Sequence, residues 1–302
     1  MRIGVAATPD VAIPALNWLK ESKHELVRVI TQPDRPSGRG QNVATSAVGN
    51  WATTNSVEVV KPASVDELDQ ALVDLDLLLT IGYGRILPKQ SLEIPRFGCI
   101  NLHFSLLPKY RGAAPVQRAI ENGEVQTGVS VFQLDEGMDT GPIYVTLPFQ
   151  ISPTLRSSEL LADLSNLGVL AISQALTDIE NNVKPIKQHG DASLAKKLSK
   201  EEGAIDWRTS SSTIINKIRA FYPSPTAWTT FRNQPVKITM AQCVEVNYKL
   251  SPGQLLVQDG KCVIGTGDGN ISLISVIPAG KKEMSALDWS RGARFIGQEH
   301  CG

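Results

Sequence analysis

"LDLLLTIGYGRILPKQSLEIPRFGCINLHF", residues 75–104, contains two apolar runs that we expect to be neighbouring strands of one sheet. The runs cover residues 75–82 and 98–104, and residues 87–93 between them have the pattern of a helical turn. Two strands joined by a helical crossover are parallel, because an antiparallel pair needs only a short turn. The stretch therefore predicts a mostly parallel sheet with flanking helices.

The same alternation of apolar runs and amphipathic stretches extends over the first half of the chain. Further strands are expected at residues 2–7, 25–31, 57–60, 127–134 and 141–151, and helices at residues 11–22, 44–54 and 64–72. A long helix of good period follows over residues 154–181 and should close this domain. We therefore predict a Rossmann-like α/β domain over residues 1–183.

The pattern changes after residue 183. Residues 184–205 are polar, charged and weakly periodic, which is typical of a linker. After one short helix, strands separated by "NQ", "DG" and "GDGN" predict a small antiparallel β-barrel over residues 206–302. "GTGDGN", residues 265–270, has strand-like sequence on both sides, so we expect a hairpin turn there and not a phosphate-binding loop.

Composition and charge limit the class of protein. With 42% apolar and 20% charged residues, and no apolar run of roughly 20 residues, we expect a soluble cytoplasmic protein with no membrane partner. The 4 cysteines have no paired spacing, which argues against a metal site or disulfides. Residues 1–188 hold 16 Lys and Arg against 20 Asp and Glu, whereas residues 206–302 hold 11 against 7. The excess of +4 indicates a polyanionic partner or ordinary scatter of surface charge.

Polar side chains alternate along the end of the strand at residues 98–104. Asn101, His103 and Ser105 share one side of it, at the carboxyl end of a parallel strand, where open α/β sheets bind ligands. An amide N–H and an imidazole side by side can bind a carbonyl oxygen that becomes an oxyanion, which stabilises it by about 3 kcal/mol per donor. A lone histidine on a strand is more often structural, but Asn101 two positions away favours a catalytic one.

The loop "DEGMDTGPI" contains Asp135 and Asp139 between glycines. Asp139 could pair with His103, raising the pKa of the imidazole, or it could serve only the turn. The sequence contains no serine nucleophile elbow and no metal-ligand spacing. These residues therefore favour direct transfer of an acyl group between two bound substrates.

"NLHFSLLPKYRGAAPVQRAIENGEVQTGVSVFQLDEGMDTGPI", residues 101–143, resembles the core of the formyltransferases that use 10-formyltetrahydrofolate. The similarity covers essentially the whole chain. It includes "TQPDRPSGRG" (31–40), "YGRILP" (83–88), "LSKEEGAIDW" (198–207), "IRAFYPSPTAW" (218–228) and "SVIPAGKKEMSALDW" (275–289). Within the family, these segments resemble the members that formylate initiator methionyl-tRNA for translation initiation.

The resemblance implies a set of site residues. Asn101, His103 and Asp139 would be catalytic, and 10-formyltetrahydrofolate would be the co-substrate, with no metal. The residues implied for the folate pocket are Tyr83, Gly84, Ile86, Ser105, Leu106, Leu107 and Pro108. The C-terminal barrel would be of the oligonucleotide-binding (OB-like) kind and would bind tRNA.

For the tRNA, the resemblance and the charge of the barrel point to Arg35 and Arg39, with Lys217 and Arg219, in a protein expected to be a monomer. The sequence departs from the family after "GRG", where lysines are expected but the uncharged "QNVATSAV" follows. Arg85 also stands where an uncharged residue is frequent. The alternatives are therefore an aminosugar-nucleotide formyltransferase, a formyltetrahydrofolate hydrolase, or a tRNA-binding module without catalysis.

Overall fold

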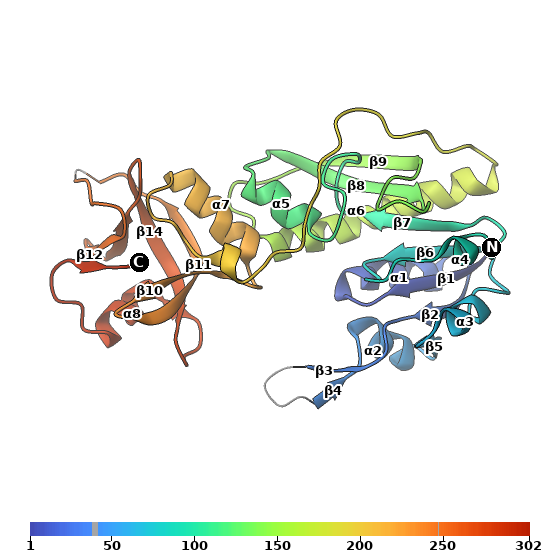
Figure 1. Cartoon of the computed structure of the whole chain (residues 1–302), viewed down its shortest axis with the longest axis horizontal. Helices are drawn as coiled ribbons and strands as arrows, with labels where there is room; N and C mark the ends of the chain where they lie inside the picture. Colours follow the sequence, from blue (N-terminus) through green and yellow to red (C-terminus); the bar gives the residue numbers. More distant parts are fainter. Residues whose placement is uncertain (38–41, 247) are drawn as a thin grey trace. The chain divides into compact units, whose positions relative to one another are not determined.

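The computed structural model describes residues 1–37, 42–246 and 248–302. They form two compact units (Figure 1). The N-terminal unit comprises Met1–Pro115, Gln126–Gln150 and Leu161–Ala195, and the C-terminal unit comprises Val116–Val125, Ile151–Leu160 and Lys196–Gly302. Of the predicted linker, residues 184–195 belong to the N-terminal unit and residues 196–205 to the C-terminal unit.

The N-terminal unit is built on one mixed sheet (Figure 1). Its strand order is β5 (Glu58–Val60), β2 (Glu25–Ile30), β1 (Arg2–Ala7), β6 (Leu77–Ile81), β7 (Cys99–His103), β8 (Gln126–Gln133) and β9 (Ile143–Gln150). The pairs from β5 to β7 are parallel, whereas β7–β8 and β8–β9 are antiparallel. The predicted mostly parallel sheet is confirmed, and β8 and β9 form an antiparallel hairpin at its edge.

The helices of this half of the chain are α1 (Ile13–Glu21), α2 (Ala47–Thr54), α3 (Val65–Gln70), α4 (Lys89–Leu92), α5 (Pro115–Glu121) and α6 (Ser157–Glu180). Serine caps begin two of them: Ser46 accepts from the Gly49 amide at 2.9 Å, and Ser64 from the Glu67 amide at 3.2 Å. The sequence did not predict α5 or the small hairpin of β3 (Arg35–Ser37) and β4 (Asn42–Ala44). Both lie where Pro and Gly residues make the sequence read as a loop.

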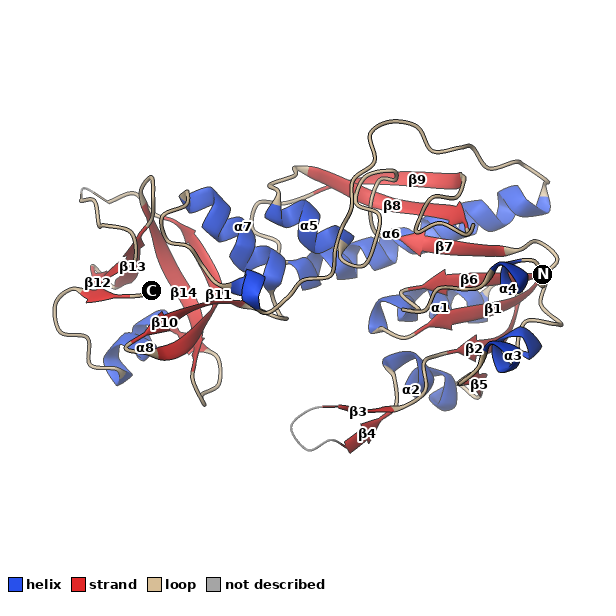
Figure 2. Cartoon of the chain, in the orientation of Figure 1, coloured by secondary structure: helices blue, strands red, loops and turns tan. Residues whose placement is uncertain are grey.

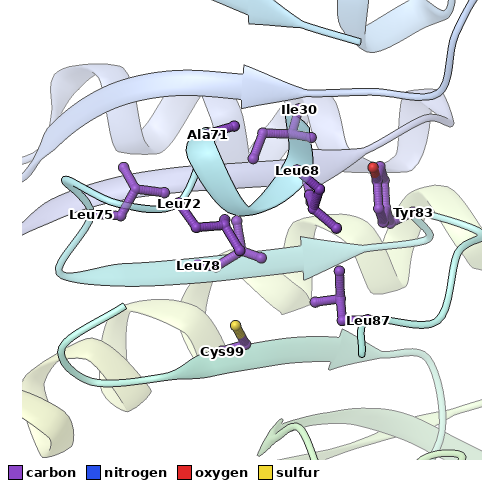
Figure 3. Close-up of a cluster of buried hydrophobic side chains, with 10 residues drawn as sticks. Ile30, Leu68, Ala71, Leu72, Leu75, Leu78, Tyr83, Leu87 and Cys99 are labelled. Carbon is purple, nitrogen blue, oxygen red and sulfur yellow. The ribbon is translucent and has the colours of Figure 1, made fainter. Parts of the chain in front are cut away.

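One buried cluster shows why the central strands read as continuous apolar runs. All of β6 is buried, because both of its faces are covered. Figure 3 shows the side chains of Leu68 in α3 and Leu72 in the turn after it facing Leu78 of β6, with Cys99 of β7 beside them. On the other face, Leu102 of β7 packs on Gly168 of α6, where an added Cβ would lie 2.5 Å from the leucine. Strand β7 is therefore held from both sides.

Helix α6 is long and apolar enough by length and composition to cross a membrane. This is weak evidence, since the core helix of a soluble protein passes the same test. Leu160, Leu164, Ile172 and Leu176 of α6 are buried in the protein. Their spacing of three to four residues and multiples of it is that of one helix face packed on a core.

The C-terminal unit is an antiparallel barrel (Figure 2). Its strand order is β10 (Ala227–Phe231), β11 (Gln234–Cys243), β14 (Asn270–Pro278), β13 (Lys261–Gly265), β12 (Gln254–Gln258) and β16 (Glu299–His300), with β15 (Met284–Ser285) beside β14. Phe231 of β10 bridges Cys301, which follows β16, so the sheet returns on itself. Helices α7 (Ser211–Phe221) and α8 (Ala286–Gly292) complete the unit. Gly265 pairs with Asn270, which confirms the hairpin predicted for "GTGDGN".

Candidate active site

A cavity of about 430 Å³ opens at the carboxyl ends of β6 and β7. It lies where the loops after these two parallel strands diverge, which is the usual position of binding crevices in open α/β sheets. Its lining residues are Pro9, Thr80, Gly82, Tyr83, Gly84, Arg85, Ile86, Leu87, Leu92, Asn101, Leu102, His103, Phe104, Gly112, Ala113, Pro115, Leu134, Asp135, Gly137, Met138 and Asp139. The three residues predicted to be catalytic all face this one cavity.

Asn101 lies in β7 opposite Thr80 of β6, because the parallel register pairs these two residues. The Asn101 Oδ1 atom accepts a hydrogen bond from the Thr80 hydroxyl at 2.7 Å. The other end of the amide, Nδ2, has no acceptor among the residues that the structure describes. Two N–H groups of Asn101 are therefore available to an oxygen atom bound in the cavity.

His103 is buried, and its two ring nitrogens have different partners. Nε2 lies 2.9 Å from the Tyr110 carbonyl oxygen and donates to it, because a carbonyl can only accept. Nδ1 lies 3.7 Å from Oδ2 of Asp139. In the neutral ring, Nδ1 thus carries a lone pair and can accept a proton.

The pKa of His103 is lowered from its ordinary value, mainly by burial. The Asp139 carboxylate and the Tyr110 carbonyl raise the pKa, but by less than burial lowers it. The expected direction of the Asp139 effect is therefore confirmed, but burial outweighs it and the net shift of the pKa is downward. Burial keeps the imidazole neutral, and Asp139 reduces the free-energy cost of charging it.

Asp139 has a left-handed backbone, with φ of 55°, in the loop between β8 and β9. Its Oδ2 atom accepts from the Gly112 amide at 2.7 Å. Asp135 takes the turn role instead, since its Oδ1 accepts from the Gly137 amide at 3.1 Å and the Thr140 hydroxyl at 2.6 Å. Of the two roles considered for Asp139, the structure thus favours the carboxylate that faces His103.

Gln188 holds the loop of Asp139 in place. Its Nε2 donates to the carbonyls of Asp139 and Gly141, each at 2.8 Å. Its Oε1 accepts from Nε and Nη2 of Arg111, at 3.2 and 2.6 Å. One amide therefore joins the loop that carries Asp139 to the segment that carries the Tyr110 carbonyl and the Gly112 amide.

The loop after β6 forms another wall of the cavity. Tyr83 is 4% exposed, and its hydroxyl has no hydrogen-bond partner among the described residues. Burial is the main reason that the pKa of this phenol is raised. Ile86 is 81% exposed at the cavity. Arg85 also lines the cavity and donates to the Pro62 carbonyl at 3.3 Å.

Of the residues predicted for the folate pocket, Tyr83, Gly84 and Ile86 line the cavity, but Ser105, Leu106, Leu107 and Pro108 are not among its lining. Ser105 is fully buried, and its hydroxyl donates to the Lys109 carbonyl at 2.6 Å. The Leu107 amide donates to the Ser130 hydroxyl at 3.2 Å. These four residues lie in the turn after β7, and their predicted contact with folate stays a prediction. The alternation that placed Ser105 beside His103 fails because β7 ends at His103.

The four residues predicted to bind tRNA have different surroundings. Arg35 begins β3, and Arg39 lies outside the described residues. Lys217 of α7 donates from Nζ to the carbonyls of Glu202 at 2.8 Å and Ala204 at 3.2 Å. Its third N–H remains for another acceptor.

Arg219 is 9% exposed, and burial lowers the pKa of its guanidinium. Its nitrogens donate to the carbonyls of Leu155 at 2.9 Å and Ser152 at 2.8 Å, and to Oδ1 of Asn216 at 3.1 Å. The prediction that Arg219 binds tRNA does not fit this position. Its hydrogen bonds are made within the protein, so we assign it a structural role.

Thr80, Gly112 and Gln188 are site residues that sequence reasoning missed. Thr80 stands in an apolar run, and only the register of β6 against β7 brings it to Asn101. Gly112 carries a φ of 119°, and a Cβ there would lie 2.9 Å from the Ala195 carbonyl. Gln188 lies within the predicted linker, residues 184–205. The glycine in "RGAAP" was the one available signal of the three.

Comparison with known proteins agrees with this fold. The sequence matches the formyl transferase family over residues 1–176 and the formyl transferase C-terminal domain over residues 197–294. It is 41% identical over 307 residues to methionyl-tRNA formyltransferase of Salinispora tropica, and the match covers 99% of each chain.

Two solved structures share the fold. HypX of Aquifex aeolicus, in complex with tetrahydrofolic acid, has a TM-score of 0.69 at 19% identity. That match covers 96% of this chain and 47% of HypX, so this chain spans about half the length of HypX. The N-formyltransferase of Helicobacter canadensis, with folinic acid and dTDP-3-aminofucose, has a TM-score of 0.68 at 20% identity, covering 90% of this chain and 98% of that one.

The fold and the two domain matches define an enzyme of the formyl transferase class. Formyl transferases take the formyl group from a formyl-tetrahydrofolate. Because a curated relative is 41% identical over nearly the full length of both chains, this chain belongs to the methionyl-tRNA formyltransferase family.

Proposed function

We propose that this protein transfers the formyl group of 10-formyltetrahydrofolate to the α-amino group of initiator methionyl-tRNA in the cytoplasm. The observation that carries the proposal is the convergence of Asn101, His103 and Asp139 on one cavity, in a chain 41% identical to a methionyl-tRNA formyltransferase. In the reaction, the amine nitrogen bonds to the formyl carbon and the bond between that carbon and N10 of the folate breaks. The proton that the amine loses ends on N10, so no other reactant is needed.

Asn101 donates hydrogen bonds to the carbonyl oxygen of the formyl group. As the amine attacks, this oxygen becomes an oxyanion, and the free N–H groups of Asn101 can donate to it. A preorganised donor costs no reorganisation at that moment, because the Thr80 hydroxyl already holds the amide. Asn101 therefore lowers the free energy of the tetrahedral intermediate relative to the bound substrate.

His103 accepts and passes on the proton that the attacking amine loses. Its Nδ1 lone pair accepts a proton from the attacking amine, since Nε2 is already bonded to Tyr110. The imidazolium that forms is stabilised by Asp139 at 3.7 Å and can then donate from Nδ1 to the oxyanion or to N10. This role requires a histidine that is neutral before the reaction. Burial favours the neutral form because it lowers the pKa of His103.

The cavity fits a folate in its chemistry. Apolar side chains of Leu87, Leu92 and Leu134 line it. Contact with such side chains stabilises a bound aromatic ring system. The buried Tyr83 hydroxyl lacks a partner among the described residues, and a polar atom of a bound ring would satisfy it. We therefore assign Tyr83, Gly84 and Ile86 to folate binding.

For the tRNA, we propose that Arg35, Arg39 and Lys217 contact phosphates. The support is the net charge of +4 over residues 206–302 and the third N–H of Lys217. The domains we propose are a catalytic domain over residues 1–183, a connecting segment over 184–205 and a tRNA-binding barrel over 206–302, in a monomer.

The deciding experiment measures formyl transfer from 10-formyltetrahydrofolate to initiator methionyl-tRNA, with elongator methionyl-tRNA for comparison, over a range of salt. Transfer to the initiator alone is the expected result. A shallow salt dependence would follow from the uncharged residues 41–48, because each lost lysine removes about one phosphate contact.

A second acceptor is favoured by one observation, the absence of charge in "QNVATSAV". A nucleotide-linked aminosugar also offers an amine, and the Helicobacter canadensis structure holds such a ligand on the same fold. Adding a dTDP-aminosugar to the same assay tests this alternative. Formylation of the sugar without formylation of either tRNA would overturn the proposed acceptor and leave the catalytic assignment standing.

A further inference from the structure

Thr80 is a buried polar residue that the proposed mechanism does not use directly. It lies in β6 between apolar neighbours, is 4% exposed and lines the cavity. The parallel register of β6 and β7 pairs it with Asn101. The hydroxyl of Thr80 is the one group of the described chain that holds the Asn101 side chain by a hydrogen bond.

The single proton of this hydroxyl has two acceptors within reach. The Thr80 Oγ1 atom is 2.7 Å from Oδ1 of Asn101 and 3.2 Å from the carbonyl oxygen of Ile100. The shorter distance is the usual one for an O–H···O bond, whereas the longer one lies beyond the usual range. The proton therefore belongs to the bond with Asn101, and Oδ1 is the end of the amide that faces Thr80.

This assignment decides what Asn101 presents to the cavity. With Oδ1 bonded to Thr80, Nδ2 faces the substrate and can donate to an oxyanion. If the amide were rotated by half a turn, Oδ1 would face the oxyanion as a second acceptor and repel it. We propose that Thr80 is a positioning residue that fixes the direction of the Asn101 amide and thereby makes it an oxyanion donor. The inference rests on the proposed formyl transfer and deepens it.

Removing the hydroxyl at constant shape tests this idea. Thr80→Val keeps the branched side chain and the packing of β6 but leaves nothing to distinguish the two ends of the amide. We expect kcat to fall about tenfold, with the KM values for folate and for the acceptor unchanged, since the donor acts on the transition state. Thr80→Ser keeps the hydroxyl and should restore most of the turnover. A Thr80→Ser variant as slow as Thr80→Val would overturn the proposal.

A double variant separates positioning from a general structural effect. Asn101→Ala alone should lower kcat about 100-fold, because it removes the donor. Adding Thr80→Val to Asn101→Ala should then cost nothing more, because there is no amide left to orient. If the two losses multiply, Thr80 acts through something other than Asn101 and the proposal is wrong.

Thr229→Val is the matched control. Thr229 is also 4% exposed and accepts a hydrogen bond from the Trp207 indole N–H at 3.0 Å, but it lies in β10 of the C-terminal unit. Its loss should lower stability and leave kcat unchanged. Should Thr80→Val be too unstable to assay, Thr80→Ala removes the same hydroxyl and is held to the same outcomes.

Each kcat is compared with that of the wild type, measured with the acceptor that the wild type formylates. A wild type that formylates no acceptor overturns the proposed function and this inference with it. A wild type that is active, with an equally active Thr80→Val variant, overturns only the inference.

Discussion

The cavity beside β7 and the helix α7 each bury a side chain that can carry positive charge, but they use its nitrogens differently. His103 has one nitrogen bonded to Tyr110 and leaves Nδ1 facing the cavity. Arg219 has its nitrogens bonded to Leu155, Ser152 and Asn216. In His103, Nδ1 is left without a hydrogen bond among the described residues and can accept a proton. In Arg219, the nitrogens donate to groups of the protein itself.

The two residues were selected from the sequence by different rules. His103 was selected by a geometric rule, the alternation of side chains along a strand. Arg219 was selected by its charge alone, and charge does not say whether a long side chain reaches solvent or folds back on carbonyls. Substitutions in the two regions test this difference.

Loss of turnover by a large factor is expected in the cavity. His103→Ala or Asp139→Asn should lower kcat by a factor on the order of 100 or more, since one removes the proton acceptor and the other removes the group that stabilises its charged form. The KM for tRNA should change little. Steady-state kinetics with saturating folate measures both quantities, and near-wild-type turnover in either variant would refute these catalytic roles.

The pH profile sharpens the same assignment. Burial lowers the pKa of His103, so kcat should stay high below pH 6.5 and fall only at more acidic pH, where Nδ1 becomes protonated. The Asp139 carboxylate raises this pKa, so Asp139→Asn should move the acidic limb to still lower pH. A shift toward higher pH would contradict the arrangement.

In α7, the effect is expected on stability. Arg219→Met leaves the Leu155 and Ser152 carbonyls and the Asn216 amide without their donor, which should cost about 2 kcal/mol, or a factor of about 30 in the folding equilibrium. Urea unfolding measures this loss. Arg208→Met is the control, because the Arg208 side chain is 83% exposed and its pair with Asp206 contributes little.

Affinity for tRNA tests the same substitution in another way. If Arg219 contacted phosphate, its loss would reduce the salt slope of tRNA binding by about one. We expect no change of slope in Arg219→Met.

A smaller loss of turnover is expected at Gln188. Gln188→Met keeps the length of the side chain but removes the bonds to Asp139, Gly141 and Arg111. Asp139 is then less well placed against His103, and we expect kcat to fall about tenfold, because small misplacements of catalytic groups are costly. Gln174→Met removes one bond, from Nε2 to Asp178, on an exposed face of α6 and should have no effect on kcat. Equal turnover in the two variants would show that the Gln188 clamp is dispensable.

At Lys217, only a change in tRNA binding is expected, and it is a small one. Lys217→Gln should reduce the salt slope of tRNA binding by about one, with kcat unchanged, because one phosphate contact is lost. Binding titrations over a range of salt measure the slope. Lys20→Gln in α1 serves as the control, and an unchanged slope in Lys217→Gln would remove this residue from the proposed tRNA surface.

Much of the fold followed from local pattern. The runs at residues 2–7, 75–82 and 98–104 became β1, β6 and β7, because a strand covered on both faces must be apolar throughout. The β10–β16 barrel followed from short strands and turn residues. What the pattern missed were α5 and the hairpin of β3 and β4, which lie where Pro and Gly residues make the sequence read as a loop.

The sequence predicted only part of the site, and there is a physical reason why it placed some residues and missed others. Asn101 and His103 belong to one strand, so their common side follows from the chain itself. The alternation that placed Ser105 on the same side no longer holds once the strand ends at His103, and the predicted folate contact of Ser105 and Leu106 to Pro108 stays a prediction. Thr80 and Gln188 were missed because the contacts that define them join residues 21 and 49 positions apart.

Local sequence was enough to define the class of sheet, the kind of barrel and the family, and to place Asn101 and His103 on one side of a strand, because each depends on residue types at short spacing or on resemblance along the chain. Three properties followed only from the folded chain: the His103 pKa is lowered, the Asn101 amide faces Thr80 with its oxygen, and Arg219 is structural. These properties depend on burial and on partners brought together across the sheet or between distant segments. Desolvation and hydrogen bonding act through space, and the distances involved are set only when the chain has folded.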